Sequence, residues 1–573
     1  MPVSNSDIAT LFERYATLLE IQGANPYRVR AYQNAARSIK SQGHEIRELV
    51  GAGTRLEELP DIGTDLAAKI RELVTTGEFA ALAELAREVP DSLADLVALP
   101  GLGPKRVRAL WTRLGVENFD ELRAAAASGR VRAMPGFGAR TERALLEAID
   151  QERARPRRIR LVSAEEQAKP LLSYLGAIPG VKQVAIAGSY RRRQETVGDL
   201  DLLLTCRRGT PAIEQFTGYE DVRQVLAKGS ARSSVVLRSG LQVDLRVVTQ
   251  ASFGSALLYF TGSKAHNLAL RRSAQKRGLK LNEYGLYRGS RRVAGNSERE
   301  VYEYLGLSFI EPELREDHGE IEAARTAKLP RLIANADVRG DLHAHTLASD
   351  GRNSLREMAA AARELGYDYL AITDHSRNTR VANGLDPKRL AAQIEEIDRL
   401  NEELVDFRVL KSSEVDILED GTLDLPDSIL RELDLTVCSV HDHFGLPREA
   451  QTGRIIRAMD NPYFNILGHP TGRLIGSRPP YPVDVERVME AAMKRGCYLE
   501  VNAQPTRLDL NDLNCRLAHD LGLKLSISTD AHSAAGLGNL HYGLDQARRG
   551  WLGPDDILNT RSWQALKKLL LRS

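Results

Sequence analysis

The sequence predicts a multidomain protein with an all-α N-terminal region, a central α+β domain and a C-terminal α/β barrel. Three observations lead to this prediction. The chain has 573 residues, which exceeds what one hydrophobic core usually holds. A helix–turn–helix pattern recurs within the first 150 residues, and from residue 340 the pattern alternates between strands and helices.

Composition indicates a soluble cytoplasmic protein. Hydrophobic residues make up 42% of the chain and charged residues 27%, and no apolar run approaches the roughly 20 residues of a membrane span. We also see no signal peptide. The four cysteines lack metal-binding or disulfide spacing, which is typical of reduced thiols. They are Cys206, Cys438, Cys497 and Cys515.

Charge and histidine are distributed unevenly. Residues 1–320 carry 47 Lys and Arg against 40 Asp and Glu, whereas the remainder carries 32 against 37. A basic front half fits a polyanionic partner, although so small an excess decides nothing alone. Nine of the twelve histidines follow residue 340, which indicates metal chemistry in the last part of the chain.

One motif occurs three times in the helical region, as LPDIGTDLAAKI (59–70), LPGLGPKRVRAL (99–110) and MPGFGARTERAL (134–145). Each copy predicts a short helix, a glycine-containing turn and a second helix, the helix-hairpin-helix pattern. Its glycines let the backbone approach a phosphate, so we expect DNA binding without sequence preference. Three ordinary helical hairpins are the alternative. The candidate DNA-binding residues are Gly63, Gly101, Gly103, Lys105, Gly136 and Gly138.

The first copy of this motif differs from the other two. Asp61 occupies the position of Gly101 and Gly136, and its carboxylate should repel a phosphate. This hairpin is therefore expected to hold DNA less well.

The central region contains VAIAGSYRRRQETVGDLDLLL (184–204), which predicts two strands joined by a Gly-Ser turn and a basic run. Strand alternation places Asp199 and Asp201 on one side, and Asp244 follows in the apolar run LQVDLRVV. Three converging carboxylates suit Mg²⁺, and two such ions can clamp both oxygens of a phosphoryl transfer. The alternative is that the aspartates merely end strands and the arginines are solvated.

The pattern G-S-x-R-R…G-D-x-D, followed by a strand with a third aspartate, resembles the nucleotidyltransferase palm of family X DNA polymerases. The resemblance implies that Asp199 and Asp201 hold two Mg²⁺ or Mn²⁺ ions and that Asp244 holds the one that activates the primer 3′-OH. It also implies nucleotide binding by Gly188, Ser189 and Arg192.

The segment YFTGSKAHNLALRR (259–272) resembles the part of these polymerases that holds the incoming nucleotide, and LNEYGLY (281–287) matches the same family. The resemblance implies that Tyr259 and Phe260 lie against the sugar beside the Gly262 turn. Asn267 would reach the base and Arg271 the template minor groove. Lys264 stands where the family has an acidic residue. A helix with an incidental Asn and Arg is the alternative.

Lys69 in the first hairpin matches a lysine that forms a Schiff base with abasic sugars in the resembling polymerases. The surroundings differ, because Asp65 and Asn34 stand where lysines are expected. Lyase activity and a simply solvated lysine both remain open.

In the C-terminal region, polar residues fall at the ends of successive predicted strands, where βα barrels place their active sites. Imidazole and carboxylate ligands together suit Zn²⁺, Mn²⁺ or Fe, and their number suggests two or three ions that activate a water. The series resembles the polymerase and histidinol phosphatase (PHP) domain. His443 is left outside the predicted ligands, which are His343, His345, Asp350, His375, Glu414, His441, His469, Asp530 and His532.

The sequence divides into five predicted parts. They are a helical lyase-like domain (1–85), a helix-hairpin-helix region (86–155), the palm with its nucleotide-binding subdomain (156–315), a charged linker (316–339) and the PHP domain (340–573).

Together these resemblances imply a bacterial family X DNA polymerase that fills gaps in DNA repair and carries a Mn²⁺- or Zn²⁺-dependent 3′-5′ exonuclease. Its expected partners are gapped or primed double-stranded DNA and deoxynucleoside triphosphates, and we expect a monomer. The alternatives are a gap-binding repair nuclease or 3′-phosphatase with weak or no polymerase activity, a DNA-binding protein without catalysis, a small-molecule phosphatase and a template-independent nucleotidyltransferase.

Overall fold

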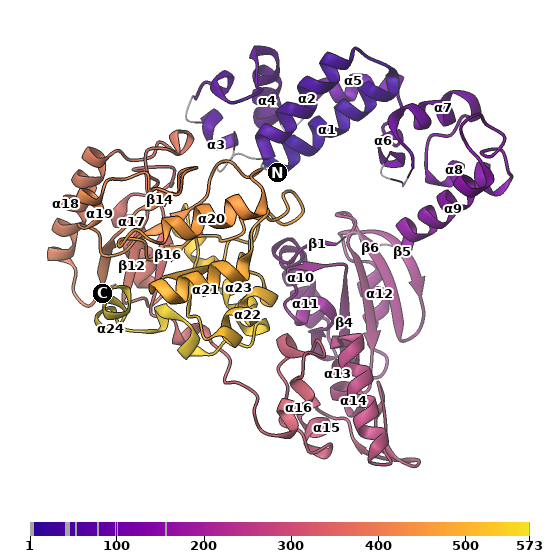
Figure 1. Ribbon diagram of the computed structural model, residues 1–573. Coiled ribbons are helices and arrows are strands. Elements are labelled where there is room, and N and C mark those ends of the chain that lie inside the picture. The colour runs from indigo at the N-terminus through magenta and orange to yellow at the C-terminus, as the bar shows by residue number, and fades with distance from the viewer. Residues whose placement is uncertain are drawn as a thin grey trace. The chain divides into compact units, whose positions relative to one another are not determined.

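The computed structural model describes residues 5–40, 46–51, 54–76, 79–97, 99, 101–154 and 158–571 (Figure 1). Residues 155–157, within the charged stretch that joins the helical region to the palm, lie outside these ranges. Contacts divide the chain into two compact units, residues 1–156 with 476–478, and residues 157–475 with 479–573. Among the described residues, no helix combines the length and hydrophobicity needed to cross a membrane.

The first unit is all-α where it is described. An aromatic cluster of Phe12, Tyr15, Tyr32 and Phe79 lies in its core, with ring centroids 4.7–5.3 Å apart. Its helices are α1 (Asn5–Gln22), α2 (Pro26–Lys40), α3 (Ile46–Gly51), α4 (Thr64–Thr76), α5 (Ala80–Glu88), α6 (Leu93–Leu96), α7 (Pro104–Leu114), α8 (Phe119–Ala127) and α9 (Ala139–Ala154), with the 3₁₀ turn η1 (Leu56–Glu58).

The repeated motif forms three turns, each followed by a helix. Gly101 and Gly136 both have φ of +84°, and Asp61 has φ of +60° at the matching position. This left-handed backbone explains the glycines, which adopt it without steric cost. It also explains how Asp61 can replace them, because aspartate is among the few other residues that adopt this conformation readily. The apolar residue after each of these positions is buried: Ile62, Leu102 and Phe137.

The palm is a five-stranded sheet in the order β2–β4–β7–β6–β5, in which β4 and β7 are parallel and the other pairs antiparallel. Leu200, Leu202 and Leu204 of β4 face the main core beneath α10 and α12, and Leu203 faces the other side. The elements are β1 (Ile159–Arg160), α10 (Leu161–Gly176), β2 (Val181–Ile186), α11 (Gly188–Arg191), β3 (Thr196–Val197), β4 (Asp199–Cys206), α12 (Ala212–Thr217), β5 (Val222–Lys228), β6 (Arg232–Leu237) and β7 (Gln242–Val247).

A smaller subdomain follows, with helices around a three-stranded sheet in the order β10–β9–β8. Its elements are η2 (Gln250–Ser252), α13 (Phe253–Thr261), α14 (Lys264–Lys276), β8 (Lys280–Asn282), β9 (Gly285–Arg288), β10 (Arg291–Ala294), α15 (Glu298–Tyr304), η3 (Pro312–Leu314) and α16 (Glu320–Arg325).

The charged segment 316–339, predicted as a linker, contains α16, whose Ile321 and Ala324 are buried. The guanidinium of the neighbouring Arg315 is fully buried and pairs with Glu298 at 2.6 Å. The many charged residues of this segment predicted an exposed linker. The structure instead packs α16 into the subdomain, where part of the neighbouring charge is neutralised by ion pairs.

Parallel strands form the C-terminal barrel, in the sheets β11–β12–β13 and β14–β15–β16–β17–β18. Bridges between His375 and Glu414, and between Ala344 and Ala531, connect the two sheets at both edges. This is the predicted distorted βα barrel. Its strands are β11 (Gly340–Ala344), β12 (Tyr369–Ile372), β13 (Arg408–Lys411), β14 (Glu414–Asp416), β15 (Val437–Ser439), β16 (Ile466–Leu467), β17 (Tyr498–Asn502) and β18 (Leu525–Ser528).

Helices cover the outside of the barrel, as Figure 1 shows. They are α17 (Leu355–Glu364), α18 (Pro387–Glu403), α19 (Asp427–Leu430), α20 (Arg448–Ala458), α21 (Val485–Arg495), α22 (Asp512–Leu521), α23 (Leu540–Arg549) and α24 (Trp563–Leu570), with short 3₁₀ turns η4 (Asn335–Asp337), η5 (Arg380–Ala382), η6 (Ala534–Asn539), η7 (Pro554–Asp556) and η8 (Leu558–Thr560).

Candidate functional site

The three palm aspartates converge as predicted. Asp201 of β4 lies in register with Asp244 of β7, and Asp199 is two residues along the same strand. Successive side chains of a strand alternate between faces, so Asp199 and Asp201 share one face with Asp244 beside them. Asp244 also accepts hydrogen bonds from Ser234 and, at 3.1 Å, from Gln242.

Electrostatics make this cluster a candidate cation site. Burial, followed by the carboxylates of Asp199 and Asp244, raises the pKa of Asp201 to about 7. Burial and Asp244 also raise the pKa of Asp199. Carboxylates that repel one another in this way are stabilised by a divalent cation, and oxygen ligands of this kind suit Mg²⁺ or Mn²⁺.

The Gly-Ser turn lies directly over this cluster. Gly188 has φ of +64°, and a Cβ at this position would lie 2.8 Å from the Asp201 Oδ2, so a larger residue would be strained and would displace this carboxylate. Arg192 ends the turn, where its guanidinium pairs with Glu316 at 3.0 Å and donates to the Thr261 carbonyl. Ser189 and Arg192 line one cavity, which is consistent with their predicted contact to a phosphate tail.

The predicted nucleotide-binding segment lies on α13 and α14. Tyr259 and Phe260 pack edge to face at 4.9 Å, and the Arg271 guanidinium lies 5.0 Å from the Tyr259 ring. Asn267 donates to the Tyr259 carbonyl at 2.7 Å. Gly262 has φ of +71° in the turn between the helices. The aromatic pair, Asn267 and Arg271 are therefore neighbours.

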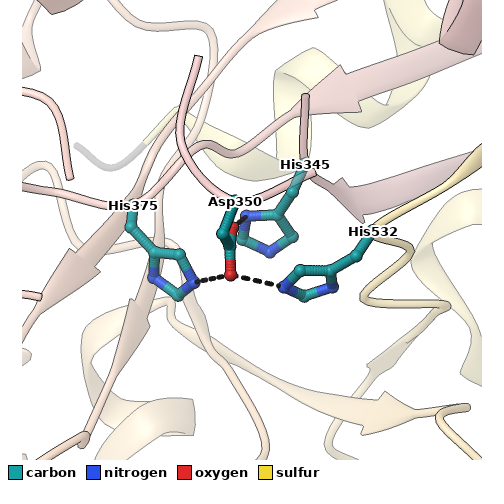
Figure 2. A group of neighbouring side chains, drawn as sticks. All are labelled: His345, Asp350, His375 and His532. Atoms are coloured by element: carbon teal, nitrogen blue, oxygen red, sulfur yellow. Dashed lines mark ion pairs between the residues drawn. The ribbon is translucent and has the colours of Figure 1, made fainter. Parts of the chain in front are cut away.

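All nine predicted barrel residues gather at one end of the strands, eight of them in three overlapping groups. These groups are His343, His345 and Asp530; His345, Asp350, His375 and His532; and His375, Glu414 and His441. The ninth residue, His469, lies 2.9 Å from Glu414. Figure 2 shows Asp350 between His375 and His532. The Nε2 atom of His532 is 3.0 Å from the Asp350 carboxylate.

These barrel residues fit divalent metal ions. Among the described atoms, the His343 Nε2, both ring nitrogens of His345 and the His469 Nδ1 are buried without a hydrogen-bond partner. Burial tends to raise the pKa of Glu414, but the imidazoles of His441, His375 and His343 outweigh it and hold the pKa well below the usual range. The donor set of nitrogen and carboxylate oxygen suits Zn²⁺, Mn²⁺ or Fe rather than Mg²⁺ alone.

The sequence analysis missed the residues that orient these ligands. Glu500 of β17 lies 2.7 Å from the His343 Nδ1, and Asp416 of β14 hydrogen-bonds the His441 Nδ1. Such contacts fix which ring nitrogen faces a metal. Burial lowers the pKa of His441, yet Glu414 and Asp416 outweigh it and raise the pKa to about 10. Glu500 sits in an apolar run, YLEVN, where one buried carboxylate was the available signal.

The surroundings of Lys69 in the first hairpin disfavour lyase chemistry. Lys69 pairs with Asp65 one helical turn away, and its side chain is 21% exposed. Burial tends to lower the pKa of Lys69, but Asp65 and Tyr32 outweigh it, so the pKa is raised. A protonated amine is a poor nucleophile, so this pairing opposes Schiff-base formation.

The hairpin turns offer open backbone to a ligand. No described atom would lie within 4 Å of a Cβ at Gly63, Gly103, Gly136 or Gly138. The second helix of each motif begins at the residue after Gly63, Gly103 or Gly138, so its free N–H groups lie beside the turn. Lys105 stands in the first turn of α7.

Family comparisons cover most of the chain. Residues 3–79 match a helix-hairpin-helix domain, and residues 93–151 a SAM-like helix-hairpin-helix tandem. Residues 164–254 match the DNA polymerase beta palm, residues 256–316 the DNA polymerase beta thumb and residues 341–504 the PHP domain.

Curated relatives match the whole chain or a part of it. The chain is 37% identical to the DNA polymerase/3′-5′ exonuclease PolX of Bacillus subtilis (strain 168), across 99% of both proteins. It is also 32% identical to a probable phosphatase of Thermoanaerobacter sp. (strain X514), over 38% of this chain and 89% of that protein. A probable phosphatase of Syntrophotalea carbinolica is 31% identical over 38% of this chain and 90% of its own length. With its hairpin, palm, thumb and PHP segments in this order, the chain belongs to the bacterial family X DNA polymerases that carry a C-terminal PHP domain.

Proposed function

We propose that this protein is a gap-filling DNA polymerase in DNA repair, with a metal-dependent 3′-5′ exonuclease in its barrel. The register of Asp201 beside Asp244 carries the polymerase assignment, because it supplies the carboxylate face that two-metal phosphoryl transfer needs. Full-length similarity to a DNA polymerase/3′-5′ exonuclease supports both activities.

In polymerisation, Asp199 and Asp201 would hold two Mg²⁺ or Mn²⁺ ions, and Asp244 would hold the one that serves the primer 3′-OH. The bound ions supply charge neutralisation and Lewis acidity to the phosphoryl transfer. Ser189 and Arg192 hold the triphosphate, while Tyr259 and Phe260 lie against the sugar. Release of Arg192 from Glu316 frees its guanidinium for the phosphates. Catalysis is mainly positioning and electrostatic stabilisation.

In the barrel, the nine candidate ligands would hold two or three Mn²⁺, Zn²⁺ or Fe ions, which would supply an activated water. Glu500 and Asp416 keep the ligating nitrogens of His343 and His441 turned inward. The substrate is a DNA 3′ end. The hairpin turns bring gapped or primed duplex DNA to both sites by backbone contacts. We further propose that the protein acts as a monomer in the cytoplasm, where its DNA substrate lies.

The test follows one labelled primer beside a one-nucleotide gap, with Mn²⁺ and with or without deoxynucleotides. We expect the primer to grow with deoxynucleotides and to shorten without them. Growth alone contradicts the exonuclease. Shortening alone contradicts the polymerase and favours a gap-binding repair nuclease.

A 3′-phosphatase is the second candidate for the barrel, because two relatives that match 38% of the chain are named probable phosphatases. A primer with a 3′-phosphate, compared with a free phosphomonoester and a 3′-hydroxyl primer, distinguishes the substrates. For the possible lyase, borohydride trapping on abasic DNA compares the wild type with Lys69→Ala. Equal trapping by both proteins removes Lys69 from that role.

A further inference from the structure

The barrel forms one wall of the cavity beside residues 188–193 of the palm, the phosphate loop. This cavity has a volume of about 430 Å³ and lies within the second compact unit. Ser189 and Arg192 line it from the palm, and Gln546 and Arg549 of α23 line it from the barrel. The proposed triphosphate site is therefore bordered by residues more than 350 positions away in the chain.

Gln546 is a buried donor at this cavity. Gln546 is 1% exposed, and its Nε2 atom has no hydrogen-bond partner among the described residues. A buried N–H group left unpaired destabilises a protein, so such groups normally meet an acceptor. Oxygens of a phosphate tail are suitable acceptors. Arg158, Arg192 and Arg549 outnumber Glu195 and Asp512 in the lining, which favours an anion.

Arg549 holds the phosphate loop in place. Its guanidinium donates to the Arg192 carbonyl at 2.8 Å and pairs with Glu316 at 3.1 Å and with Asp512 at 2.6 Å. Glu316 in turn pairs with the Arg192 side chain. One helical turn earlier, Asp545 pairs with Arg193 of the same loop at 2.7 Å. Two adjacent turns of α23 thus contact two successive loop residues.

We propose that helix α23 of the barrel completes the nucleotide site of the palm. Gln546 donates a hydrogen bond to the phosphate tail of the incoming deoxynucleoside triphosphate, and Arg549 is a positioning residue for the loop that carries Arg192. This inference rests on the proposed polymerase function and names the part of the substrate that the barrel recognises.

The test measures binding of dATP with Mg²⁺, and of inorganic tripolyphosphate with Mg²⁺, to the full-length protein by calorimetry. Gln546→Leu removes the amide at nearly constant volume. We expect about tenfold weaker binding of both probes, the loss of one hydrogen bond to a charged acceptor. On a gapped primer, the same variant should show a higher KM for dATP with little change in kcat.

Gln451→Leu is the matched control, because Gln451 of α20 is also fully buried and its side-chain amide also lacks a partner among the described residues, but it does not line the cavity. If Gln546→Leu binds dATP and tripolyphosphate as tightly as Gln451→Leu does, the role of Gln546 is overturned. Weaker dATP binding with unchanged tripolyphosphate binding also overturns it, since the contact would then lie outside the phosphate tail.

Arg549→Gln, Arg549→Lys and Arg548→Gln test the positioning role. Arg548 is the neighbouring arginine, which contacts Glu313 and Ile333 instead of the loop. We expect a raised KM for dATP in Arg549→Gln, partial rescue in Arg549→Lys and no change in Arg548→Gln. Equal KM values for Arg549→Gln and Arg548→Gln contradict the role. A wild type that binds dATP but never extends a primer refutes the polymerase, while the binding comparison still decides the inference.

Discussion

The palm and the barrel both gather carboxylates, but their charges are balanced in different ways. In the palm, Asp199, Asp201 and Asp244 face one another, and burial with mutual repulsion raises the pKa of Asp201 to about 7. In the barrel, imidazoles surround the carboxylates. There the pKa of Asp530 is well below its usual range, because His343, His345 and His532 outweigh the effect of burial.

This difference indicates two kinds of metal dependence. The palm presents oxygen ligands alone, which suit weakly held, exchangeable Mg²⁺ that can arrive with a nucleotide. The barrel presents a buried mixed set held by further carboxylates, which suits ions that remain resident. One chain can thus separate synthesis from degradation by metal chemistry.

The largest expected effect comes from Asp244→Ala, which removes one carboxylate from the palm only. Extension should fall at least about a thousandfold, because a metal clamp contributes several kcal/mol to the transition state. Single-turnover assays on one labelled primer measure extension and shortening together. Shortening by the barrel is the internal control, and surviving extension contradicts the role of Asp244.

The reciprocal variant, His343→Ala, should reduce Mn²⁺-dependent shortening about a hundredfold or more while extension continues. His443→Ala is the matched control, since its imidazole is 46% exposed and lies outside the three ligand groups. If His343→Ala shortens the primer as fast as His443→Ala does, the barrel is not the nuclease.

A smaller effect is expected from Glu500→Gln, which keeps the shape of the side chain but removes the charge beside His343. Loss of such an orienting carboxylate typically weakens metal affinity about 10- to 100-fold. Mn²⁺ titration of the shortening activity should show a higher midpoint, with activity restored at saturating metal. A loss that excess Mn²⁺ does not restore would mean that Glu500 acts on the substrate instead.

The two sites should also differ in pH dependence. The raised pKa of Asp201 means that protons compete with Mg²⁺ below pH 7, and the Mg²⁺ midpoint for extension should rise up to about tenfold per pH unit there. Above pH 7 it should level off. The pKa of His441 is raised to about 10, so the Mn²⁺ midpoint for shortening should continue to fall from pH 7 to 8.5. If the Mg²⁺ midpoint for extension and the Mn²⁺ midpoint for shortening change with pH in parallel, the two sites do not differ in this way.

Raised carboxylate pKa values also predict the stability of the metal-free palm. The folded Asp201 binds protons more tightly than the unfolded one, so the stability that this group contributes to the metal-free palm is fully present below its unfolded pKa of about 4 and is lost as pH rises towards 7. Added Mg²⁺ should cancel this loss, as thermal unfolding with and without the ion can measure.

Local patterns predicted most of the side chains that gather in the two candidate metal sites. Asp199 and Asp201 follow from strand alternation, and the nine barrel residues follow from their places at the ends of predicted strands. The helix in the predicted linker was missed because charged residues dominate the segment, and the sequence does not show that Glu320 is buried against the distant His266. Glu500 was missed because one carboxylate in an apolar strand has no distinguishing neighbour in sequence.

By itself, the sequence determined the fold class, the repeated hairpin turns and which residues are candidate ligands, because these depend on periodicity and on chemistry carried by short motifs. Only the tertiary structure decided which residues act across the chain: Glu500 on His343, Arg549 on the Arg192 loop and Gln546 at the phosphate cavity. The physical reason is that hydrogen bonds and ion pairs depend on distances of about 3 Å in space, and packing alone sets those distances between residues remote in sequence.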